Sequence, residues 1–395
     1  MAGPLAGLRV LDFTIAQQGP YATLLLADMG AEVIKVEQPG NGEVGRVLGI
    51  DRKRGFSAYF LAINRGKKSL TLNLKSEQGR DVALRLSRDC DIVVHNFRPG
   101  VMEKLGLGYE AFKAANPHVI YAGASAFGSK GPLGDKPGND ICAQAYGGLM
   151  SMTGEGEAPI PTGAAIADHI GALTLALGIV SAVVHRERTG VGQELEASLL
   201  GSIMAAQSWE LTLHMMNGEL HEKAGRGNSL LPFQWYAYQT SDGYLAVGGV
   251  TPGRWAGFCK AIDWPELETD DHWSSIGNRM RDRHEINQLI DERLKQRETG
   301  YWLPRLEAAD IFCAPVLDHE QLTSGEQANA NGYILEIEHP RQGAVRVIPL
   351  PLSFSESPVD SSRPEPLLGE HSEVVLRERG YSNDEIESLR GAGVI

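Results

Sequence analysis

The sequence predicts an α/β fold with a mostly parallel sheet, joined to a smaller α+β domain. In the first 200 residues, short apolar runs of strand length alternate with longer segments of helical pattern, which is typical of parallel sheets whose strands are connected by helices. Beyond about residue 230, a hairpin pattern and several helical patterns follow instead. The length of 395 residues, of which 42% are apolar, suits two or three domains with a sizeable core.

The first three elements form a predicted βαβ unit. Residues 8–13 have the pattern of a buried strand, residues 20–29 that of an apolar helix beginning with Pro20, and residues 31–37 that of a second strand. The alternation then continues with strands at residues 69–73, 91–95 and 118–122, and with helices at residues 76–86 and from about residue 101.

The turn after the first strand, Thr14-Ile-Ala-Gln-Gln-Gly19, bears on the kind of ligand. It lacks the G-x-G-x-x-G sequence that lets the backbone approach a dinucleotide pyrophosphate. Glu37, at the end of the second strand, does imitate the acid that binds the ribose in nicotinamide enzymes. Because the glycines are missing, a nicotinamide or flavin cofactor is not expected.

A long apolar segment lies in the middle of the chain. Residues 170–184 contain no charged side chain and mix glycine and alanine with larger aliphatic residues, which indicates a helix packed on all sides. Asp168 stands at its start. One interpretation is a helix N-cap, since a carboxylate there accepts hydrogen bonds from free N–H groups. The other is a nucleophile, partly desolvated by the small apolar residues at 164–167.

The rest of the chain changes in character. A strand-like return at residues 192–200 and a Met-rich helical segment lead into a glycine-containing loop at residues 222–229. A hairpin turning at Asp242-Gly243, several helices, a further pair of extended runs and a final helix pair follow. The predicted division is therefore a large domain at residues 1–200, a linker at 201–230, a small α+β domain at 231–325, and a return linker with C-terminal helices that complete the large domain at 326–395.

Charge and cysteine content exclude several classes of protein. A net charge of −13 argues against nucleic-acid binding, which calls for a basic surface. The four cysteines are far apart and have no metal-binding spacing, so neither a metal site nor a disulfide framework is expected. The start of the chain has no targeting pattern, and the longest uncharged apolar run is short of a membrane span. We therefore expect a cytoplasmic protein with no membrane or nucleic-acid partner.

Basic residues gather around two predicted strands of this acidic chain. They are Arg65, Lys67, Lys68 and Lys75 beside the third strand, and Arg98 and Lys104 after the fourth. Loops at the carboxyl ends of parallel strands commonly bind ligands, and a phosphate-rich ligand would need such charge. The alternative is that these side chains are ordinary solvated surface charges.

Several short sequences, taken in order, run nearly from end to end of the chain. They are Leu11-Asp-Phe13 with Gly19-Pro20, Gly30-Ala-Glu-Val-Ile-Lys-Val-Glu37, Asn64-Arg-Gly-Lys-Lys-Ser69, Asn96-Phe-Arg-Pro-Gly-Val101, Ala167-Asp168, Arg188-Thr-Gly-Val-Gly-Gln193 and Leu368-Gly-Glu-His371. In this order they resemble the class III CoA-transferases, typified by formyl-CoA and carnitine CoA-transferases and related to the acyl-CoA racemases.

The resemblance implies a fold and a set of site residues. It implies a Rossmann-like large domain and a small domain joined by long linkers, two chains interlocked as a homodimer, and coenzyme A as a substrate with no permanently bound cofactor. Asp168 aligns with the catalytic carboxylate, Gln17 with a position implicated in the formyl-CoA branch, and Gly225 and Gly227 with the glycine-rich lid. The residues expected to line the coenzyme A site are Asn64, Arg65, Lys67, Lys68, Leu72, Lys75, Asn96, Phe97, Arg98 and Lys104.

The expected chemistry is transfer of coenzyme A between carboxylic acids by way of Asp168, through a mixed anhydride and an aspartyl thioester. Two alternatives are an acyl-CoA racemase and a non-catalytic acyl-CoA-binding protein. Racemases of this superfamily carry a catalytic histidine where this chain has Asn139, which cannot act as a base at neutral pH. The formyl-CoA branch carries a tyrosine near that point, so a different acceptor pocket is expected.

The substrates are expected to be a small dicarboxylic acid and succinyl-CoA or a close relative. Arg46, Arg52, Arg54 and Arg226 prompt this expectation, since a guanidinium suits a planar carboxylate.

Overall fold

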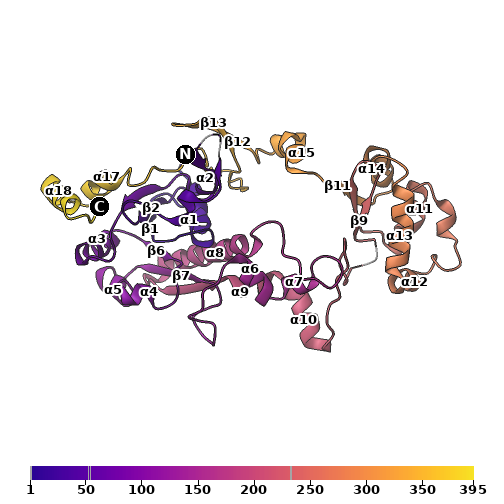
Figure 1. The fold of residues 1–395 in the computed structure, drawn as a ribbon, viewed down its shortest axis with the longest axis horizontal. Coiled ribbons are helices and arrows are strands. Elements are labelled where there is room, and N and C mark those ends of the chain that lie inside the picture. Colours follow the sequence, from indigo (N-terminus) through magenta and orange to yellow (C-terminus); the bar gives the residue numbers. More distant parts are fainter. Residues whose placement is uncertain (1, 52, 54, 232–233) are drawn as a thin grey trace. The chain divides into compact units, whose positions relative to one another are not determined.

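The computed structural model describes residues 2–51, 53, 55–231 and 234–395 (Figure 1). The chain forms two compact units. The first, called here the sheet unit, comprises the chain up to Gly147 together with Gly163–Ala206 and Glu326–Ile395. The second, called the small unit, comprises Gly148–Thr162 and Gln207–Gly325. The chain therefore leaves the sheet unit briefly before it enters the central helix.

A six-stranded parallel sheet organises the sheet unit. Its strands are β1 (Arg9–Asp12), β2 (Glu32–Glu37), β5 (Lys68–Thr71), β6 (Ile92–His95), β7 (Ile120–Ser125) and β8 (Glu194–Ser198). Their order in space is β5-β2-β1-β6-β7-β8, so the direction of winding reverses between β1 and β6. In doubly wound sheets, ligands bind at this point, beyond the carboxyl ends of the strands. The predicted α/β class and parallel sheet are confirmed.

Helices cover both faces of this sheet because its strands are apolar on both sides. On β1, Val10 belongs to the core shared with α1 (Gln18–Asp28) and α8 (Ile166–Thr189). The next residue, Leu11, points to the opposite core, as alternation along a strand requires. That second core is completed by α3 (Glu77–Ser87), α5 (Tyr109–Ala115), α17 (Ser372–Glu378) and α18 (Asn383–Gly391). The C-terminal helices thus pack in the same unit as the first strands (Figure 1).

Shorter elements complete the sheet unit. They are η1 (Val44–Val47), β3 (Ile50–Asp51), β4 (Phe56–Ser57), α2 (Ala58–Asn64), α4 (Val101–Lys104), α6 (Asp140–Tyr146), α9 (Leu199–Ala206), α16 (Glu326–Ala330) and the hairpin of β12 (Leu335–His339) with β13 (Gly343–Val347). The hairpin packs its apolar side, through Ile337, Val345 and Val347, on Leu61 of α2.

The small unit has its own core around an antiparallel sheet. This sheet contains β9 (Tyr236–Gln239), β10 (Tyr244–Gly248) and β11 (Phe312–Pro315), with β10 in the middle. Its helical elements are α7 (Leu149–Met152), α10 (Ser208–Asn217), η2 (Pro252–Arg254), α11 (Trp255–Ala261), η3 (Pro265–Glu268), α12 (Ile276–Arg281), α13 (Arg283–Leu294), α14 (Thr299–Ala308) and α15 (His319–Ser324). The predicted hairpin at Asp242-Gly243 is confirmed, because β9 and β10 pair on either side of it.

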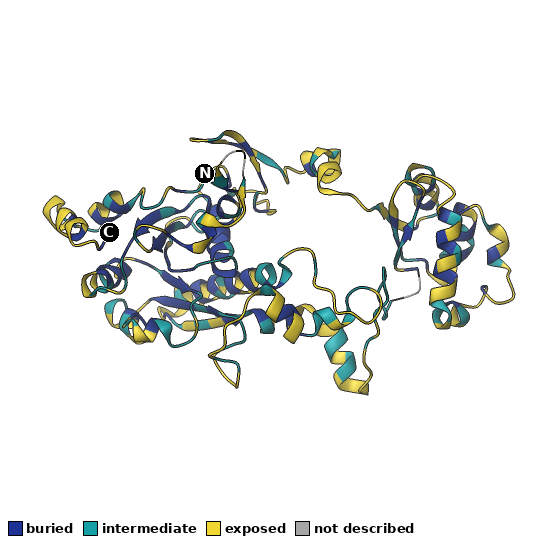
Figure 2. Ribbon diagram, in the orientation of Figure 1, coloured by how far each residue is buried: buried dark blue, intermediate teal, exposed yellow. Residues whose placement is uncertain are grey.

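The central helix α8 differs from the expectation in one respect. It is not packed on all sides within one chain, because Leu173 is 54% exposed and Leu177 is 69% exposed (Figure 2). Only the opposite face, which includes Leu175 and Ile179, joins the core against the sheet and α1. In length and composition α8 could cross a membrane, but here it is part of the core of the sheet unit. It ends at Thr189, with Gly190 in the left-handed conformation.

Candidate active site

The loop that follows β1 lies at the point where the sheet reverses its winding. Asn96, directly after β6, holds this loop with both ends of its amide. Its Oδ1 accepts a hydrogen bond of 2.7 Å from the Ile15 N–H, and its Nδ2 donates one of 2.7 Å to the Ile15 carbonyl. This pair of hydrogen bonds between the two chain segments fixes the loop that contains Gln17.

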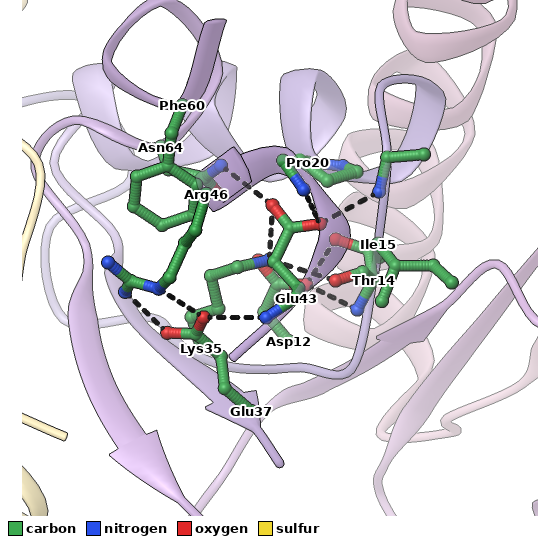
Figure 3. A network of polar contacts seen from close by, with 12 residues as sticks. Asp12, Thr14, Ile15, Pro20, Lys35, Glu37, Glu43, Arg46, Phe60 and Asn64 are labelled. Atoms are coloured by element: carbon green, nitrogen blue, oxygen red, sulfur yellow. Dashed lines mark hydrogen bonds and ion pairs between the residues drawn. The ribbon is translucent and has the colours of Figure 1, made fainter. Parts of the chain in front are cut away.

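A buried polar network supports the same loop from beneath (Figure 3). Lys35 donates a hydrogen bond of 2.8 Å to the Thr14 carbonyl, and Glu43 accepts one of 3.0 Å from the Ala16 N–H. Ala16 has a φ of 61°, in the left-handed region that residues with a side chain rarely adopt. The backbone is therefore held by buried charges in a strained turn immediately before Gln17, which is a common property of functional loops.

Lys67 forms part of this internal network rather than of a ligand surface. Its ammonium lies 3.1 Å from the Asp12 carboxylate and donates hydrogen bonds to Asn64 Oδ1 and the Pro20 carbonyl, and the side chain is buried. Burial lowers the pKa of Lys67 to about 8. Burial by itself would raise the pKa of Asp12, but the ammonium groups of Lys67 and Lys35 outweigh it and hold that pKa below its ordinary value.

Asp168 does not cap α8, so the capping interpretation is wrong. The N-cap residue is Ala165, and Asp168 lies inside the first turn. Asp140, at the start of α6, takes the capping role instead. Its Oδ1 accepts hydrogen bonds from the backbone N–H groups of Ala167 at 2.7 Å and of Asp168 at 3.1 Å. No local pattern signals this exchange of roles, since the two acids are 28 residues apart in the chain.

The carboxylate of Asp168 is left available for chemistry. Within the described part of the chain, no group donates a hydrogen bond to its side chain. Burial raises its pKa to about 7, and the neighbouring negative charge of Asp140 adds to the shift. A desolvated carboxylate that is partly charged at neutral pH is a far better nucleophile than one stabilised by hydrogen bonds.

Tyr59 is a site residue that sequence reasoning missed. It lies on α2, and burial first, then the charges of Asp168 and Glu43, raise the pKa of its phenol. Its hydroxyl therefore keeps its proton at neutral pH and can act as a hydrogen-bond donor close to Asp168. No motif marked Tyr59, because its proximity to the Asp168 charge arises only in the folded chain.

Gln17 reaches the same turn of α8. Its Nε2 lies 3.2 Å from Nδ1 of His169, which also lies 2.9 Å from the Ala165 carbonyl. The structure thus brings together Asp168, Gln17 and Tyr59 from three elements that are distant in the sequence.

Half of the residues expected to bind coenzyme A serve the fold instead. Asn64, Arg65, Lys67 and Leu72 are all buried. Arg65 pairs with Asp28 at 2.5 Å, and Leu72 belongs to the core beside α3. Asn96 holds the loop after β1, as described above. Burying a charge or an amide costs free energy unless it is paired, and the buried Arg65, Lys67 and Asn64 each have a polar partner.

The remaining expected residues differ in exposure. Lys75, Arg98 and Lys104 are exposed, and Lys68 is half-buried and bonded to Glu32 at 2.6 Å. Phe97 lines a cavity of about 320 Å³ at the ends of β6 and β7, next to His95 and Tyr121. Three acids, Glu103, Glu194 and Glu196, also line it. This cavity does not suit phosphate groups, which leaves the exposed basic residues as the candidates for them.

The expected lid loop belongs to the small unit and is tied to its neighbours. Gly225 has a φ of 59° and forms an isolated bridge with Gly154. Gly227 forms another with Tyr236, and a side chain at Gly227 would meet the Trp235 carbonyl at 2.8 Å. Glycine is therefore required at both positions for the path of the backbone.

The arginines considered for a second substrate carboxylate are engaged elsewhere. Arg46 binds the Glu37 carboxylate with two nitrogens at 2.7 Å each. Glu37 is thus unavailable to a ribose, contrary to its resemblance to such an acid. Arg226 pairs with Asp291. Arg52 and Arg54 lie outside the described residues.

Asn139 caps α6, accepting a hydrogen bond from the Cys142 N–H at 3.4 Å. It therefore has a structural role at the position where the racemases carry their catalytic histidine. Across the described residues, no group of three or more histidine, cysteine or acidic side chains forms a candidate metal site.

Comparisons with known proteins agree with this geometry. Residues 5–372 match the model of the CoA-transferase family III. The chain is 33% identical to the human succinyl-CoA:glutarate CoA-transferase, covering 99% of this chain and 90% of the relative, and 34% identical to the formyl-CoA:oxalate CoA-transferase of Streptomyces coelicolor, covering all of both chains. A solved CAIB/BAIF family protein from Brucella suis superimposes with a TM-score of 0.86 at 30% identity, covering 96% of this chain and all of the other. The match of residues 5–372 to the family model, together with relatives that are 33% and 34% identical over nearly the whole chain, identifies the protein as a member of the CoA-transferase family III.

Proposed function

We propose that this enzyme transfers coenzyme A from an acyl-CoA donor to a free carboxylic acid, with Asp168 as the covalent carrier. The observation that supports this most directly is the Asp168 carboxylate itself. It has no hydrogen-bond donor among the described residues and a pKa raised to about 7, while Asp140 satisfies the neighbouring backbone N–H groups.

The proposed cycle has four acyl transfers. The Asp168 carboxylate attacks the donor thioester, and the carbon–sulfur bond breaks to give a mixed anhydride and the coenzyme A thiolate. The thiolate attacks the Asp168 carbonyl, which releases the donor acid and leaves an aspartyl thioester. The acceptor carboxylate displaces the thiolate to form a second anhydride. The thiolate then attacks the acyl carbonyl, which yields the new acyl-CoA and restores Asp168.

Each step passes through a tetrahedral oxyanion that needs preorganised donors. The Gln17 amide and the Tyr59 hydroxyl are the candidates, since Gln17 contacts His169 in the first turn of α8 and Tyr59 interacts electrostatically with Asp168. Both anhydrides react readily with water, so the site must close during the reaction. We assign closure to the loop around Gly225 and Gly227, as the family resemblance implies.

For the substrates we propose a short dicarboxylic acid and a dicarboxylic acyl-CoA. The support is the human relative, named succinyl-CoA:glutarate CoA-transferase, rather than the arginines, because Arg46 and Arg226 already have acidic partners. A screen of acyl-CoA donors against mono- and dicarboxylates tests this directly. A tenfold preference for a monocarboxylate over every dicarboxylate would contradict it while leaving the transferase mechanism intact.

The covalent mechanism is tested by substituting and trapping Asp168. Asp168→Ala is expected to abolish transfer without unfolding the chain, because Asp140 and not Asp168 caps α8. With donor present, hydroxylamine is expected to convert the wild-type Asp168 side chain to a hydroxamate, detected by peptide mass spectrometry. Asp135→Asn, a change at an exposed acid, serves as the control. Trapping at Asp140 instead would overturn the assignment.

A further inference from the structure

The side chain of His169 makes two contacts that cannot both be satisfied as ordinary hydrogen bonds. Its Nδ1 lies 2.9 Å from the Ala165 carbonyl, which can only accept, and 3.2 Å from Nε2 of Gln17, which can only donate. A ring nitrogen carries either a proton or a lone pair in this direction, not both.

The Ala165 contact decides between the two states. It is the shorter of the two, and the carbonyl is part of the first turn of α8 and cannot rotate away. Nδ1 therefore carries the proton. The Gln17 amide satisfies its own contact by turning its oxygen toward Nδ1, since the oxygen and nitrogen of an amide occupy nearly equivalent positions. The Nδ1 proton is then shared between two acceptors, the Ala165 carbonyl and the Gln17 oxygen. The amide NH₂ group then faces away from His169.

The surroundings hold His169 in this position. The edge of the Tyr21 ring packs on its imidazole, with centroids 4.7 Å apart. Gln18, the other amide in the loop, is buried and occupies the space left by the missing side chain of Gly171, so it cannot replace Gln17. Gln17 is thus the amide available at the start of α8, and its orientation depends on its neighbour His169.

We propose that His169 is a positioning residue that holds the Gln17 amide with its oxygen on Nδ1, which leaves the NH₂ group to donate to the oxyanion formed when Asp168 attacks the acyl group. This inference rests on the proposed function, because it requires an oxyanion on the adjacent Asp168 adduct. It adds a residue with no assigned role, which acts through Gln17 and does not itself touch the substrate.

Two substitutions test the hydrogen-bond donor of His169 separately from the packing of its ring. His169→Asn places an amide nitrogen at the position of Nδ1 but removes the ring, whereas His169→Phe keeps ring packing on Tyr21 and removes the donor. His169→Phe is expected to lower kcat about tenfold to a hundredfold, the scale of a misplaced catalytic group, with KM for acyl-CoA within about threefold. His169→Asn is expected to retain most of the activity. His185→Phe, at an exposed histidine of the same helix, is the matched control.

A double-mutant cycle with Gln17→Ala completes the test. In the Gln17→Ala background, His169→Phe is expected to cause no further loss, because its effect passes through the amide. Additive losses, full activity of His169→Phe, or full activity of Gln17→Ala would each overturn the proposal. Loss in His169→Asn equal to that in His169→Phe would also overturn it, by showing that the ring and not the donor matters. Hydroxylamine trapping of wild-type Asp168 is measured in parallel, so that a failure of the covalent mechanism is recognised separately.

Discussion

The reactivity proposed for Asp168 depends on the different roles of two acids. Asp140 accepts the hydrogen bonds of the first turn of α8, and Asp168 is left without them. Burial is the larger cause of the raised pKa of Asp168, and the charge of Asp140 is the second. A carboxylate in the capping position itself would have been stabilised as an anion and would have been a weaker nucleophile.

This arrangement predicts the pH dependence of the reaction. Asp168 must be ionised to attack, and its pKa is about 7, so kcat/KM is expected to rise with pH through about 7 and to level off above it. Asp140→Asn keeps an oxygen for the backbone N–H groups but removes the repelling charge. The midpoint of the profile is therefore expected to move to lower pH. Asp135→Asn should leave it in place, and an unmoved midpoint in Asp140→Asn would exclude this coupling.

The role of Lys67 can be tested separately. Its position in the sequence suggested that it binds a ligand, whereas its surroundings in the structure indicate that it stabilises the fold. Lys67→Met leaves the buried Asp12 without its nearest cation, which is expected to cost about 3–5 kcal/mol of stability. The measurement is the unfolding midpoint, compared with that of Lys75→Met at an exposed site. A variant of wild-type stability with a raised KM for acyl-CoA would instead restore Lys67 to the coenzyme A site.

The loop after β1 and the segments after β5 and β6 all lie at the same edge of the parallel sheet, the one formed by the carboxyl ends of its strands. The loop is fixed by Asn96, Lys35 and Glu43, so it is preorganised before any substrate binds. The exposed charged side chains at this edge do not take part in that hydrogen-bond network. They are Lys75, Arg98 and Lys104. The basic segments identified in the sequence thus contain two populations, one that builds the edge and one that is free to meet phosphates.

Charge reversal in the exposed population is expected to weaken acyl-CoA binding. Lys75→Glu or Arg98→Glu should raise KM for the donor about fivefold to tenfold at low ionic strength with little change in kcat, because only ground-state attraction is lost. The difference should shrink as salt screens the charges. Lys113→Glu, at an exposed lysine of α5 outside the predicted coenzyme A segments, is the control. Unchanged donor kinetics in both variants would move the coenzyme A site elsewhere.

The C-terminal segment belongs to the sheet unit in the completed fold. Ser361 donates a hydrogen bond of 2.6 Å to Asp28 at the end of α1, and the Gly369 N–H donates one of 2.9 Å to Ser69 on β5. Gly369 has a φ of 68°, and a side chain there would press against Thr71. The returning chain is therefore hydrogen-bonded to the sheet at the sequence Leu368-Gly-Glu-His371.

The exposed apolar face of α8 is the feature of the whole molecule that a single chain does not explain. We propose that a second copy covers it, in the interlocked homodimer that the family resemblance implies. The wild-type protein is expected to sediment at twice the mass of the chain, and Leu177→Glu is expected to shift it toward the monomer, because a charge would enter an apolar contact. Lys136→Glu, at an exposed residue outside α8, tests for a general effect of added negative charge. A monomeric wild-type protein would contradict the proposal.

The sequence by itself determined the elements and much of their order. Strands of β-branched residues alternating with helices specify a parallel sheet through local periodicity alone, and Asp168 is recognisable because it breaks an apolar run. Asp168 could therefore be proposed as the active-site acid once the family resemblance was added, and Gly190 allows the left-handed turn that ends α8.

Only the tertiary structure decided which polar side chains are buried and paired within the protein and which stay available to a ligand. Whether Lys67 faces a ligand or Asp12, whether Arg46 meets a substrate or Glu37, and which acid caps α8 all depend on partners brought together from distant parts of the chain. Local patterns cannot encode these pairings, because the free energy of a charged group is set by its burial and its nearest counter-charge. For the same reason the apolar pattern of α8 could not reveal how much of its surface one chain covers.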